Sequence, residues 1–486
     1  MAKMYKFELY TKLQKETPQI YSEFVEAARE LEIKDDEKMT FGCTGAVSGC
    51  PALIRRDVEK AMNEINRKVI GCVSLQHEIR KIVKDAYGDE WDACPVNTCE
   101  AALQVVFDQL VAPPMMTRGD RYMTRYIAPY ERHIHHQGGY GVPFPPKYKD
   151  IVCERGETSG EAGMAGKHLQ NLATVFVPLE GADYSCHGIK YFPCTLLKNV
   201  DPIKSEPILK KTAERHAPYL AGLSSLGYDT PGYGYGIKDT NGAPKLQKIL
   251  AKIAKDFNVP YIIDNAWGIP FVGSDPRKTG CDLMLYSMDK ASGSPTAGLI
   301  IGKEEPLVQI RRALGMHGAR YGTTASYGKA QFVTLDPGKE MLAGMIQALK
   351  VCLEKPESIK KPVDELYQMV KEEFGKIHPK IRPYFSIDKS YNSQAVEVNY
   401  EDSWKDKEIG IPIFSIEDMY AGSHILQVGL SKIGIIPTIM YDANIFFSPG
   451  LGTLDEDGKL IYETMRKSVR ATVILLEIIS KHSGLI

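Results

Sequence analysis

The feature that most constrains the fold of this chain is the stretch from residue 261 to residue 302, YIIDNAWGIPFVGSDPRKTGCDLMLYSMDKASGSPTAGLIIG. It contains three short apolar runs, Tyr261–Asp264, Leu283–Leu285 and Leu299–Ile301, separated by glycine, proline and polar residues. Runs of this length are typical of buried strands. The first run ends on a carboxylate, and Lys290 stands between the second and third runs.

Lys290 is unusual because alanine, serine and glycine surround it at the end of an apolar strand. Lysine is among the residue types that are least often buried. A desolvated lysine amine is a nucleophile and can bond covalently to a carbonyl group. The alternative interpretation is that Lys290 is solvated and that Asp264 is a strand-end turn residue.

The order Asp264-Asn265-Ala266, then Ser287, then Lys290 resembles the core of the fold-type-I enzymes that use pyridoxal 5'-phosphate (PLP), the aspartate aminotransferase superfamily. The resemblance implies that Lys290 forms a Schiff base with PLP and later moves protons at the substrate carbon. It also implies that Asp264, followed by Ala266, keeps the pyridine nitrogen protonated, so that the ring acts as an electron sink. Ser287 stands where the superfamily often has a serine that binds the cofactor phosphate.

A second candidate site lies in residues 93–102, ACPVNTCEAA, where Asn97, Thr98 and Cys99 precede the amphipathic helix expected from residue 103 to residue 110. Free backbone N–H groups and the helix dipole make such a helix start an anion site. The resemblance places the phosphate-binding loop at this triplet. The alternative interpretation is that Thr98 is a plain N-cap.

Residues 118–147 are rich in aromatic and basic side chains and contain His133, His135 and His136. The pattern HxHH lacks the carboxylate and the helical spacing of a common metal motif, so we predict no metal site. Members of the superfamily place an aromatic or histidine ring over the cofactor in this part of the chain. The resemblance favours His135 or His136 for that role, without deciding between them.

Residues 320–323, Arg-Tyr-Gly-Thr, match an Arg-x-Gly-Thr motif of the cysteine-desulfurase branch (class V). In that branch the threonine binds the cofactor phosphate of the partner subunit. The resemblance therefore implies that Thr323 reaches a neighbouring site and that the protein is a homodimer with shared active sites. A glycine turn at a domain boundary is the alternative. The segment around Lys290 is also similar to the selenocysteine-synthase-like group.

The resemblance implies an α/β chain with the three-layer PLP-dependent transferase fold, built on a mainly parallel seven-stranded sheet, and a smaller α+β C-terminal domain. We predict an N-terminal helical segment at 1–37, a large PLP-binding domain at 38–334 and a small domain at 335–486. The sequence predicts a helix that starts near Thr17 and Pro18. Further helices and strands are expected at 75–87, 173–177, 190–197, 220–226, 245–257, 339–353, 361–377, 394–399, 416–433, 435–440, 444–448 and 455–481.

Two expectations concern recognition of the substrate. Many relatives carry Arg-x-Ser in the last strand, where the arginine binds the substrate carboxylate. Here Phe446 stands in the place of that arginine. Arg55 and Arg56 are alternative anion partners, but we expect both to be solvated on the surface.

The resemblance to these two groups favours a lyase or transferase that eliminates or replaces a group at the β or γ carbon of an amino acid or amino-acid derivative. An aminotransferase is the alternative, and a decarboxylase is a lesser one. A protein with this fold that binds PLP without catalysis, as a sensor or assembly partner, is the minor alternative.

The composition bears on partners and location. With 60 basic and 61 acidic residues the net charge is −1, which gives no overall field to attract nucleic acid. No run of eighteen apolar residues is present, so we expect no membrane association. The ten cysteines are scattered without a CxxC pair, which favours a reducing, cytoplasmic location.

Overall fold

The structure is a computed structural model of the whole chain. It describes residues 5–46, 52–111, 117–118, 121–131, 142–144, 172–183, 196–290, 292–314, 332–404, 410–411, 425–437, 439–441 and 443–486. Structural statements below refer to these residues.

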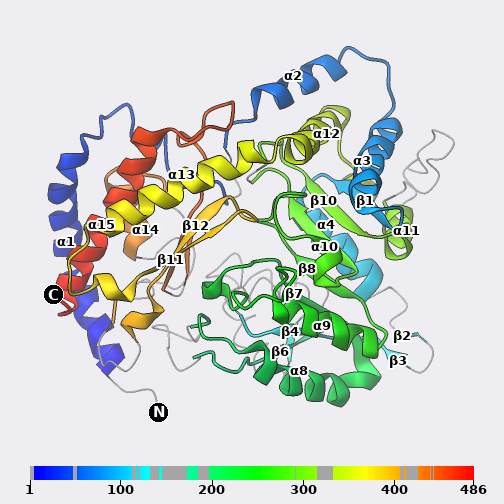
Figure 1. Cartoon of the computed structure of the whole chain (residues 1–486), viewed down its shortest axis with the longest axis horizontal. Helices are drawn as coiled ribbons and strands as arrows, with labels where there is room; N and C mark the ends of the chain where they lie inside the picture. Colours follow the sequence, from blue (N-terminus) through cyan, green and yellow to red (C-terminus); the bar gives the residue numbers. More distant parts are fainter. Residues whose placement is uncertain are drawn as a thin grey trace.

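The centre of the fold is a sheet whose strands run in the order β1-β10-β9-β8-β7-β4-β6-β5 (Figure 1). Within the described residues β10 is the one antiparallel strand of this sheet, because it pairs antiparallel with both β1 and β9 while all other neighbours are parallel. The strands are β1 (Trp91–Val96), β4 (Arg125–Pro129), β5 (Val142–Phe144), β6 (Ala173–Val177), β7 (Leu220–Leu226), β8 (Tyr261–Asp264), β9 (Leu283–Ser287) and β10 (Gly298–Lys303).

The apolar runs of the sequence become strands that are buried on both faces. All residues of β7, β8 and β9 are buried. Alternation along β8 sends Tyr261 and Ile263 to one face of the sheet and Ile262 to the other. Continuous apolar strands of this kind are typical of parallel sheets that helices cover on both sides.

Helices cover both faces of this sheet, which confirms the predicted three-layer fold. One face packs against α2 (Arg56–Ile65), α3 (Cys72–Tyr87), α8 (Pro202–His216), α9 (Lys245–Asp256) and α12 (Lys339–Glu354). The other face packs against α4 (Cys99–Val106), its π-helical continuation η2 (Phe107–Val111) and α11 (Glu304–Ala313). The eighth strand, β5, is a short addition at the edge of the expected seven.

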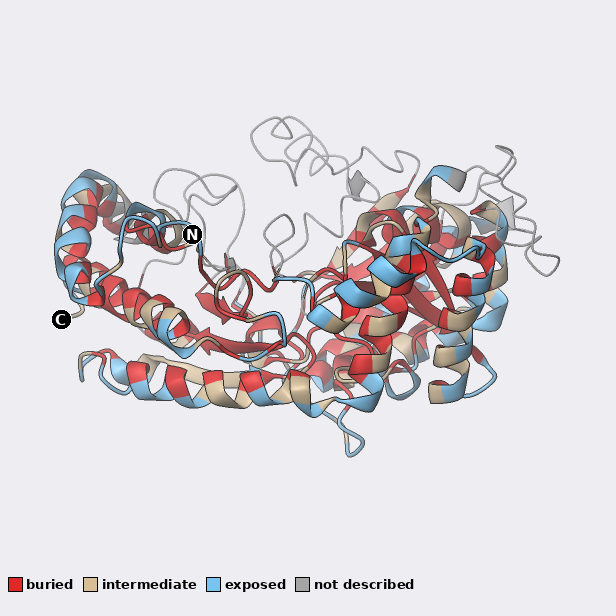
Figure 2. Cartoon of the chain, turned by 90° about the horizontal axis from the view of Figure 1, so that it is seen from above, coloured by how far each residue is buried: buried red, intermediate tan, exposed pale blue. Residues whose placement is uncertain are grey.

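A second, antiparallel sheet has the strand order β11-β12-β14-β13. It consists of β11 (Ser386–Ser390), β12 (Ala395–Asn399), β13 (Ile439–Tyr441) and β14 (Asn444–Phe447). Its core is shared with α1 (Tyr5–Ala27), α13 (Glu357–Phe374), α14 (Ile425–Lys432) and α15 (Tyr462–His482). In Figures 1 and 2 this unit lies beside the large sheet, and the chain ends on it.

The remaining elements are short: η1 (Ala28–Leu31), β2 (Thr117–Arg118), β3 (Arg121–Tyr122), η3 (Ala217–Tyr219), η4 (Pro231–Tyr233), α10 (Pro276–Thr279), η6 (Val333–Leu335), η7 (Arg382–Tyr384) and η8 (Glu401–Ser403). None of the described helices is long and apolar enough to cross a membrane.

The N-terminal helix begins earlier than predicted. Helix α1 starts at Tyr5 and runs through Pro18 instead of starting there. Leu13, Ile20 and Phe24 are completely buried against the second sheet's core, so the apolar stripe continues across the proline. The Thr17 hydroxyl donates to the Leu13 carbonyl oxygen at 2.8 Å. Tertiary packing thus outweighs the lost hydrogen bond of the proline.

A further boundary differs from expectation. The helix predicted at 455–481 begins at Tyr462, because residues 455–459 form a turn in which the Asp455 carboxylate accepts from the Asp457 and Lys459 N–H groups. Of the helix predicted at 416–433, residues 425–432 are helical and 416–424 lie outside the described residues. Most of the strand expected at 190–197 also lies outside them. Helix α12 packs against α2 and α3. The predicted domain boundaries at residues 37/38 and 334/335 stay a prediction.

Candidate active site

The registers of neighbouring strands bring the predicted residues to one edge of the large sheet. Gly298, at the start of β10, is paired with Val96 at the end of β1 and with Ser287 at the end of β9. Asp264, the last residue of β8, is paired with Leu285. The carboxyl ends of β1, β8 and β9, which run in the same direction, and the start of the antiparallel strand β10 therefore meet here. Open α/β sheets bind ligands at the carboxyl ends of their strands.

Asp264 and Ser287 extend from the same face of the sheet. Ile262 and Leu285 belong to the core on the α4 side, and strand alternation puts Asp264 and Ser287 on that side as well. Asp264 is only 7% exposed, and its Oδ1 atom accepts a hydrogen bond from the Ala266 N–H at 3.1 Å. The carboxylate is thus held at the buried strand end, two residues before Ala266.

The N-terminus of α4 stands over this edge. The Thr98 hydroxyl accepts from the Ala101 N–H at 3.0 Å, so Thr98 is the N-cap of α4. A β-carbon on Gly298 would lie 2.1 Å from the Thr98 carbonyl oxygen, so only glycine permits this close contact. The Asn97 N–H donates to the Leu335 carbonyl oxygen at 2.9 Å, which fixes the loop from its other side.

The electrostatics of Cys99 connect Asp264, Lys290 and the start of α4. Burial raises the pKa of the Cys99 thiol well above its usual value, and the Asp264 carboxylate adds to the rise. The Lys290 ammonium acts on the same thiol in the opposite sense. The phosphate-loop candidate, the strand-end carboxylate and the reactive lysine are therefore near neighbours.

Lys290 lies in a tight turn after β9 and is partly buried. Its N–H approaches the Ser287 carbonyl oxygen at 3.5 Å. The Ser287 hydroxyl donates to the Asp289 carboxylate at 2.5 Å, an interaction that the sequence did not suggest. The serine expected to bind phosphate thus has a protein partner in this structure.

Several predicted residues cannot be placed. His133, His135, His136 and the segment 320–323 with Thr323 lie outside the described residues. Their roles stay predictions.

Phe446 is packed in an aromatic cluster beside the site. Its ring centroid lies 4.9 Å from that of Trp267 and 5.9 Å from that of Tyr233, and the side chain is 1% exposed. Tyr228 stacks on the other two rings, at 4.5 Å from Trp267 and 4.4 Å from Tyr233. Because Trp267 follows Ala266 directly, this aromatic cluster lies next to the end of β8 that carries Asp264.

The expectation that Arg55 is a solvated surface residue is wrong. Arg55 is 9% exposed, and its backbone N–H donates to the Gly293 carbonyl oxygen at 3.2 Å. A β-carbon on Gly293 would lie 2.4 Å from the Arg55 Cγ atom, so the side chain lies flat on the segment that follows Lys290. The neighbouring Arg56 is exposed, as expected, and pairs with Glu456.

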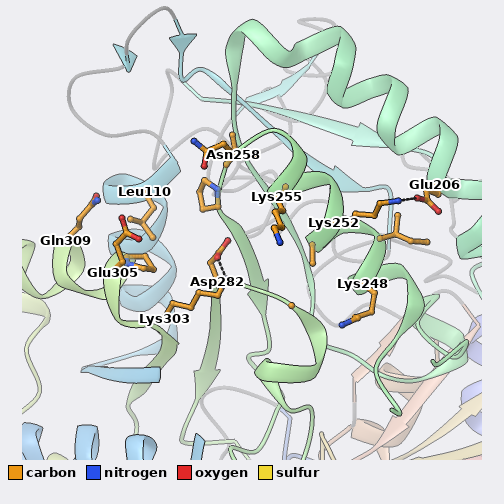
Figure 3. A pocket seen from close by; sticks show the side chains of 17 residues that line it. Leu110, Glu206, Lys248, Lys252, Lys255, Asn258, Asp282, Lys303, Glu305 and Gln309 are labelled. Carbon is orange, nitrogen blue, oxygen red and sulfur yellow. Dashed lines mark hydrogen bonds and ion pairs between the residues drawn. The ribbon is translucent and has the colours of Figure 1, made fainter. Parts of the chain in front are cut away.

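A pocket of about 920 Å³ lies at the opposite edge of the sheet (Figure 3). Pro260 and Asp282, which precede β8 and β9, line it together with Lys303 at the end of β10. Lys248, Lys252 and Lys255 of α9 lie along one side, and Lys252 pairs with Glu206 at 3.3 Å. None of the predicted site residues lines this pocket.

Comparisons with known proteins show the fold of this chain. No protein-family model and no curated protein matches the sequence. Among solved structures, an amine transaminase from an uncultivated Pseudomonas species in the PLP-bound form matches with a TM-score of 0.54 and 11% identity, over 91% of each chain. The adenosylmethionine-8-amino-7-oxononanoate aminotransferase from Methanocaldococcus jannaschii matches with a TM-score of 0.53 and 12% identity, over 92% of this chain and 90% of that one.

A third similar structure is the S-selective transaminase from Bacillus megaterium, with a TM-score of 0.52 and 14% identity, over 88% of this chain and 87% of that one. At these identities the likeness shows the fold alone. It confirms the predicted fold, that of the fold-type-I PLP-dependent transferases.

Proposed function

We propose that this protein is a PLP-dependent enzyme that acts on an amino acid or an amino-acid derivative. The observation that carries the proposal is the meeting of Asp264, Lys290 and the N-terminus of α4 around Cys99 at the carboxyl edge of the large sheet. The shared fold, with a PLP-bound structure among its similar proteins, supports the same reading.

The residues at this site fit the three functional groups of PLP: the ring nitrogen, the phosphate and the aldehyde. A ring nitrogen needs a carboxylate, which Asp264 supplies from a buried position. A phosphate needs N–H groups and hydroxyls, which the start of α4 supplies through its free backbone donors, with Asn97, Thr98, Cys99 and Ser287 beside it. An aldehyde needs an amine, which Lys290 supplies.

The bound cofactor supplies an electron sink that stabilises negative charge at the substrate α-carbon. The residues of this chain supply the rest. Asp264 would hold the proton on the ring nitrogen, Lys290 would attach the cofactor and then move the proton at the α-carbon, and Ala266 would contribute to the binding site of the ring. The proposal keeps His135 or His136 as the ring that covers the cofactor.

For the reaction we favour elimination or replacement at the β or γ carbon, with an aminotransferase as the alternative. The aromatic cluster of Phe446, Trp267 and Tyr233 supports this preference, because it offers no cation to a substrate carboxylate at that place. Binding of PLP without turnover is the minor alternative. The burial of the described thiols Cys43, Cys94, Cys99, Cys281 and Cys352 supports a cytoplasmic location.

The decisive experiment traps the cofactor on the lysine. Purified protein is mixed with PLP, reduced with borohydride and digested, and the peptide masses are measured. We expect a phosphopyridoxyl group on Lys290 in the native protein and none at that position in Lys290→Ala. The control is Lys303→Ala, which removes a lysine from the opposite edge of the sheet and should leave the label in place. A native protein that takes up no PLP would overturn the assignment.

The reaction type is tested by adding single amino acids and phosphoserine to the PLP-loaded protein. Release of ammonia or a keto acid in many turnovers would support the lyase. Stoichiometric conversion of the cofactor to pyridoxamine 5'-phosphate would support the aminotransferase. If PLP binds and no compound reacts, the binding-protein alternative gains.

We further propose a homodimer in which Thr323 reaches the cofactor phosphate of the partner's site. Mixed dimers of Lys290→Ala and Thr323→Ala chains test this. If sites are shared, one mixed site carries both lesions and the other carries neither, so activity is partly restored. No restoration would mean that each site is built from one chain.

A further inference from the structure

A buried asparagine of the second sheet reaches the strand end that carries Asp264. Asn392 lies in the turn at residues 391–394, between β11 and β12, and is only 2% exposed. Turn residues are usually solvated. Here the turn is inserted into the loops that follow β7 and β8 of the large sheet.

The amide of Asn392 makes four hydrogen bonds, which use all of its capacity. Its Nδ2 atom donates to the Asn265 Oδ1 atom at 2.9 Å and to the Gly227 carbonyl oxygen at 3.1 Å. Its Oδ1 atom accepts from the Asn265 Nδ2 atom at 3.2 Å and from the Ser274 N–H at 2.9 Å. Asn265 and Asn392 thus form a reciprocal amide pair inside the protein.

Three glycines make room for this pair. A β-carbon on Gly268 or Gly227 would lie 2.0 Å or 2.4 Å from amide atoms of Asn265. A β-carbon on Gly273 would lie 2.1 Å from the Asn392 Oδ1 atom. Real β-carbons do not approach so closely, so the two amides occupy a cradle that only glycine permits.

The pair is connected to Asp264 on both sides. Asn265 is the next residue in the chain, and the Gly227 N–H donates to the Asp264 carbonyl oxygen at 2.7 Å. Asn392 therefore bonds the side chain of the residue that follows Asp264 and the carbonyl oxygen of Gly227, the residue whose N–H bonds the Asp264 carbonyl oxygen. The Ile269 N–H donates to the Asn392 carbonyl oxygen at 2.8 Å, which extends the connection along the loop.

We propose that Asn392 is a positioning residue that aims the Asp264 carboxylate at the cofactor ring nitrogen and so couples the second sheet to the active site. The inference rests on the proposed function. Asn392 touches no reacting group. It acts through Asn265 and Gly227, whose buried polar groups would each lose hydrogen bonds without it.

The test uses the full-length protein with Asn392→Ala and a matched control at the end of β11, the strand that leads into the turn. The control is Ser390→Ala, because the Ser390 hydroxyl bonds Asp229 and the Ser393 N–H but neither Asn265 nor Gly227. We expect Asn392→Ala to raise the dissociation constant of PLP by roughly 10- to 100-fold, as losses of outer partners do elsewhere. Ser390→Ala should bind PLP as the native protein does.

Hydrogen exchange without PLP gives an independent readout. The Ser274 amide donates to the Asn392 side chain and should exchange faster in Asn392→Ala, while the Ile269 amide, which donates to the backbone carbonyl oxygen of residue 392, and amides within β7 stay protected. If Asn392 only stabilised the fold in general, the Ser274 amide and the amides within β7 would both exchange faster in Asn392→Ala.

Asn392→Asp keeps the shape of the side chain and adds a negative charge when the carboxyl group is ionised. A charged aspartate places an oxygen against the Gly227 carbonyl and the Asn265 Oδ1 atom, whereas a protonated one can donate to one of them. The PLP affinity of this variant, relative to the native protein, should therefore recover as the pH falls. This variant also serves if Asn392→Ala does not fold.

The outcomes separate the two proposals. If the native protein binds PLP and both Asn392 variants match its affinity at every pH, the role of Asn392 is overturned and the proposed function stands. If the native protein binds no PLP, the proposed function fails, and the exchange result then reports only a structural clamp.

Discussion

The carbonyl oxygen of Thr98 lies 2.1 Å from the point where a β-carbon on Gly298 would stand. This contact joins the N-cap of α4 to the first residue of β10, two elements that are far apart in the chain. Because Gly298 is paired with Ser287, the contact also fixes the distance between the phosphate-loop candidate and the segment that ends in Lys290. The geometry of the site therefore depends on Gly298, because glycine has no side chain.

Gly298→Ala should damage this site. The methyl group meets backbone atoms of Thr98 and Cys99, which cannot rotate away, so the helix start must move. We expect a loss of about 1–3 kcal/mol in the free energy of unfolding, as in other overpacked interiors, together with weaker PLP binding. Denaturant unfolding and a PLP titration measure both. Gly71→Ala is the control, since nothing lies within 4 Å of its added β-carbon. Equal behaviour of the two variants would contradict the prediction.

Asp264→Asn should keep the protein folded and impair the chemistry. The amide has nearly the same shape but cannot hold a proton on the ring nitrogen by its charge, so turnover should fall roughly 100- to 10,000-fold. Steady-state rates on the amino acid that the substrate screen selects would show this. Asp282→Asn is the matched control, because Asp282 stands just before the adjacent strand β9, at the other edge of the sheet. Undiminished turnover in Asp264→Asn would remove Asp264 from the pyridine site.

Asp92→Asn should destabilise the fold without touching the site. Arg80 and Arg311 each lie 2.8 Å from the Asp92 Oδ2 atom, and Asp92 is completely buried. Removing the carboxylate leaves the Arg311 charge buried without its partner, at a cost of about 3–5 kcal/mol. Urea unfolding measures this cost. Asp35→Asn, which breaks an exposed pair with Lys38, should give no measurable change.

The pH dependence of the Asp92 effect follows from its pKa. Burial alone would raise this pKa, but the two arginines hold it below its usual value. The stabilisation is therefore complete above the unfolded-state pKa of about 3.9 and is lost as the pH falls through the folded-state pKa. The native protein and Asp92→Asn should converge in strong acid. A constant difference between them would refute the ion-pair explanation.

Asp336 should give stability an opposite pH dependence. Burial raises the pKa of this carboxyl to about 7, and its Oδ1 atom makes no hydrogen bond. Since the folded-state pKa lies above the unfolded-state value, stability falls as the pH rises from about 4 to about 7. Asp336→Asn should therefore be the more stable protein at pH 8, by about 1–2 kcal/mol, because partial exposure reduces the full cost. An equal advantage at pH 4 and pH 8 would point to a cause other than ionisation.

The parts of the site that could be predicted from the sequence depend on local patterns. Asp264 and Lys290 follow apolar runs that are buried strands in any context, and Thr98 precedes a helix whose free N–H groups need a cap. Such signals lie within a few residues of the group that they identify.

The parts that were missed depend on contacts between distant segments. Strand β1 contains Pro95 and the charged Asp92, and it forms because β10 pairs with it and two arginines neutralise the carboxylate. Arg55 is buried only because Gly293 comes against it. Asn392 reads as an ordinary turn residue, and nothing near it in the sequence indicates its four bonds.

The pairing of β1 with β10 has a consequence for biosynthesis. Within the described residues β10 is the strand that pairs with β1, and Trp91 is matched with Lys303. At about 5–20 residues per second, the ribosome needs on the order of 10 to 40 s to extend the chain from one to the other. During that interval β1 is outside the exit tunnel without β10, its partner strand, and its apolar residues are exposed to aggregation. The candidate active site depends on the same pairing, because Val96 and Gly298 meet in it. It is thus among the last parts of the large sheet that a nascent chain can complete.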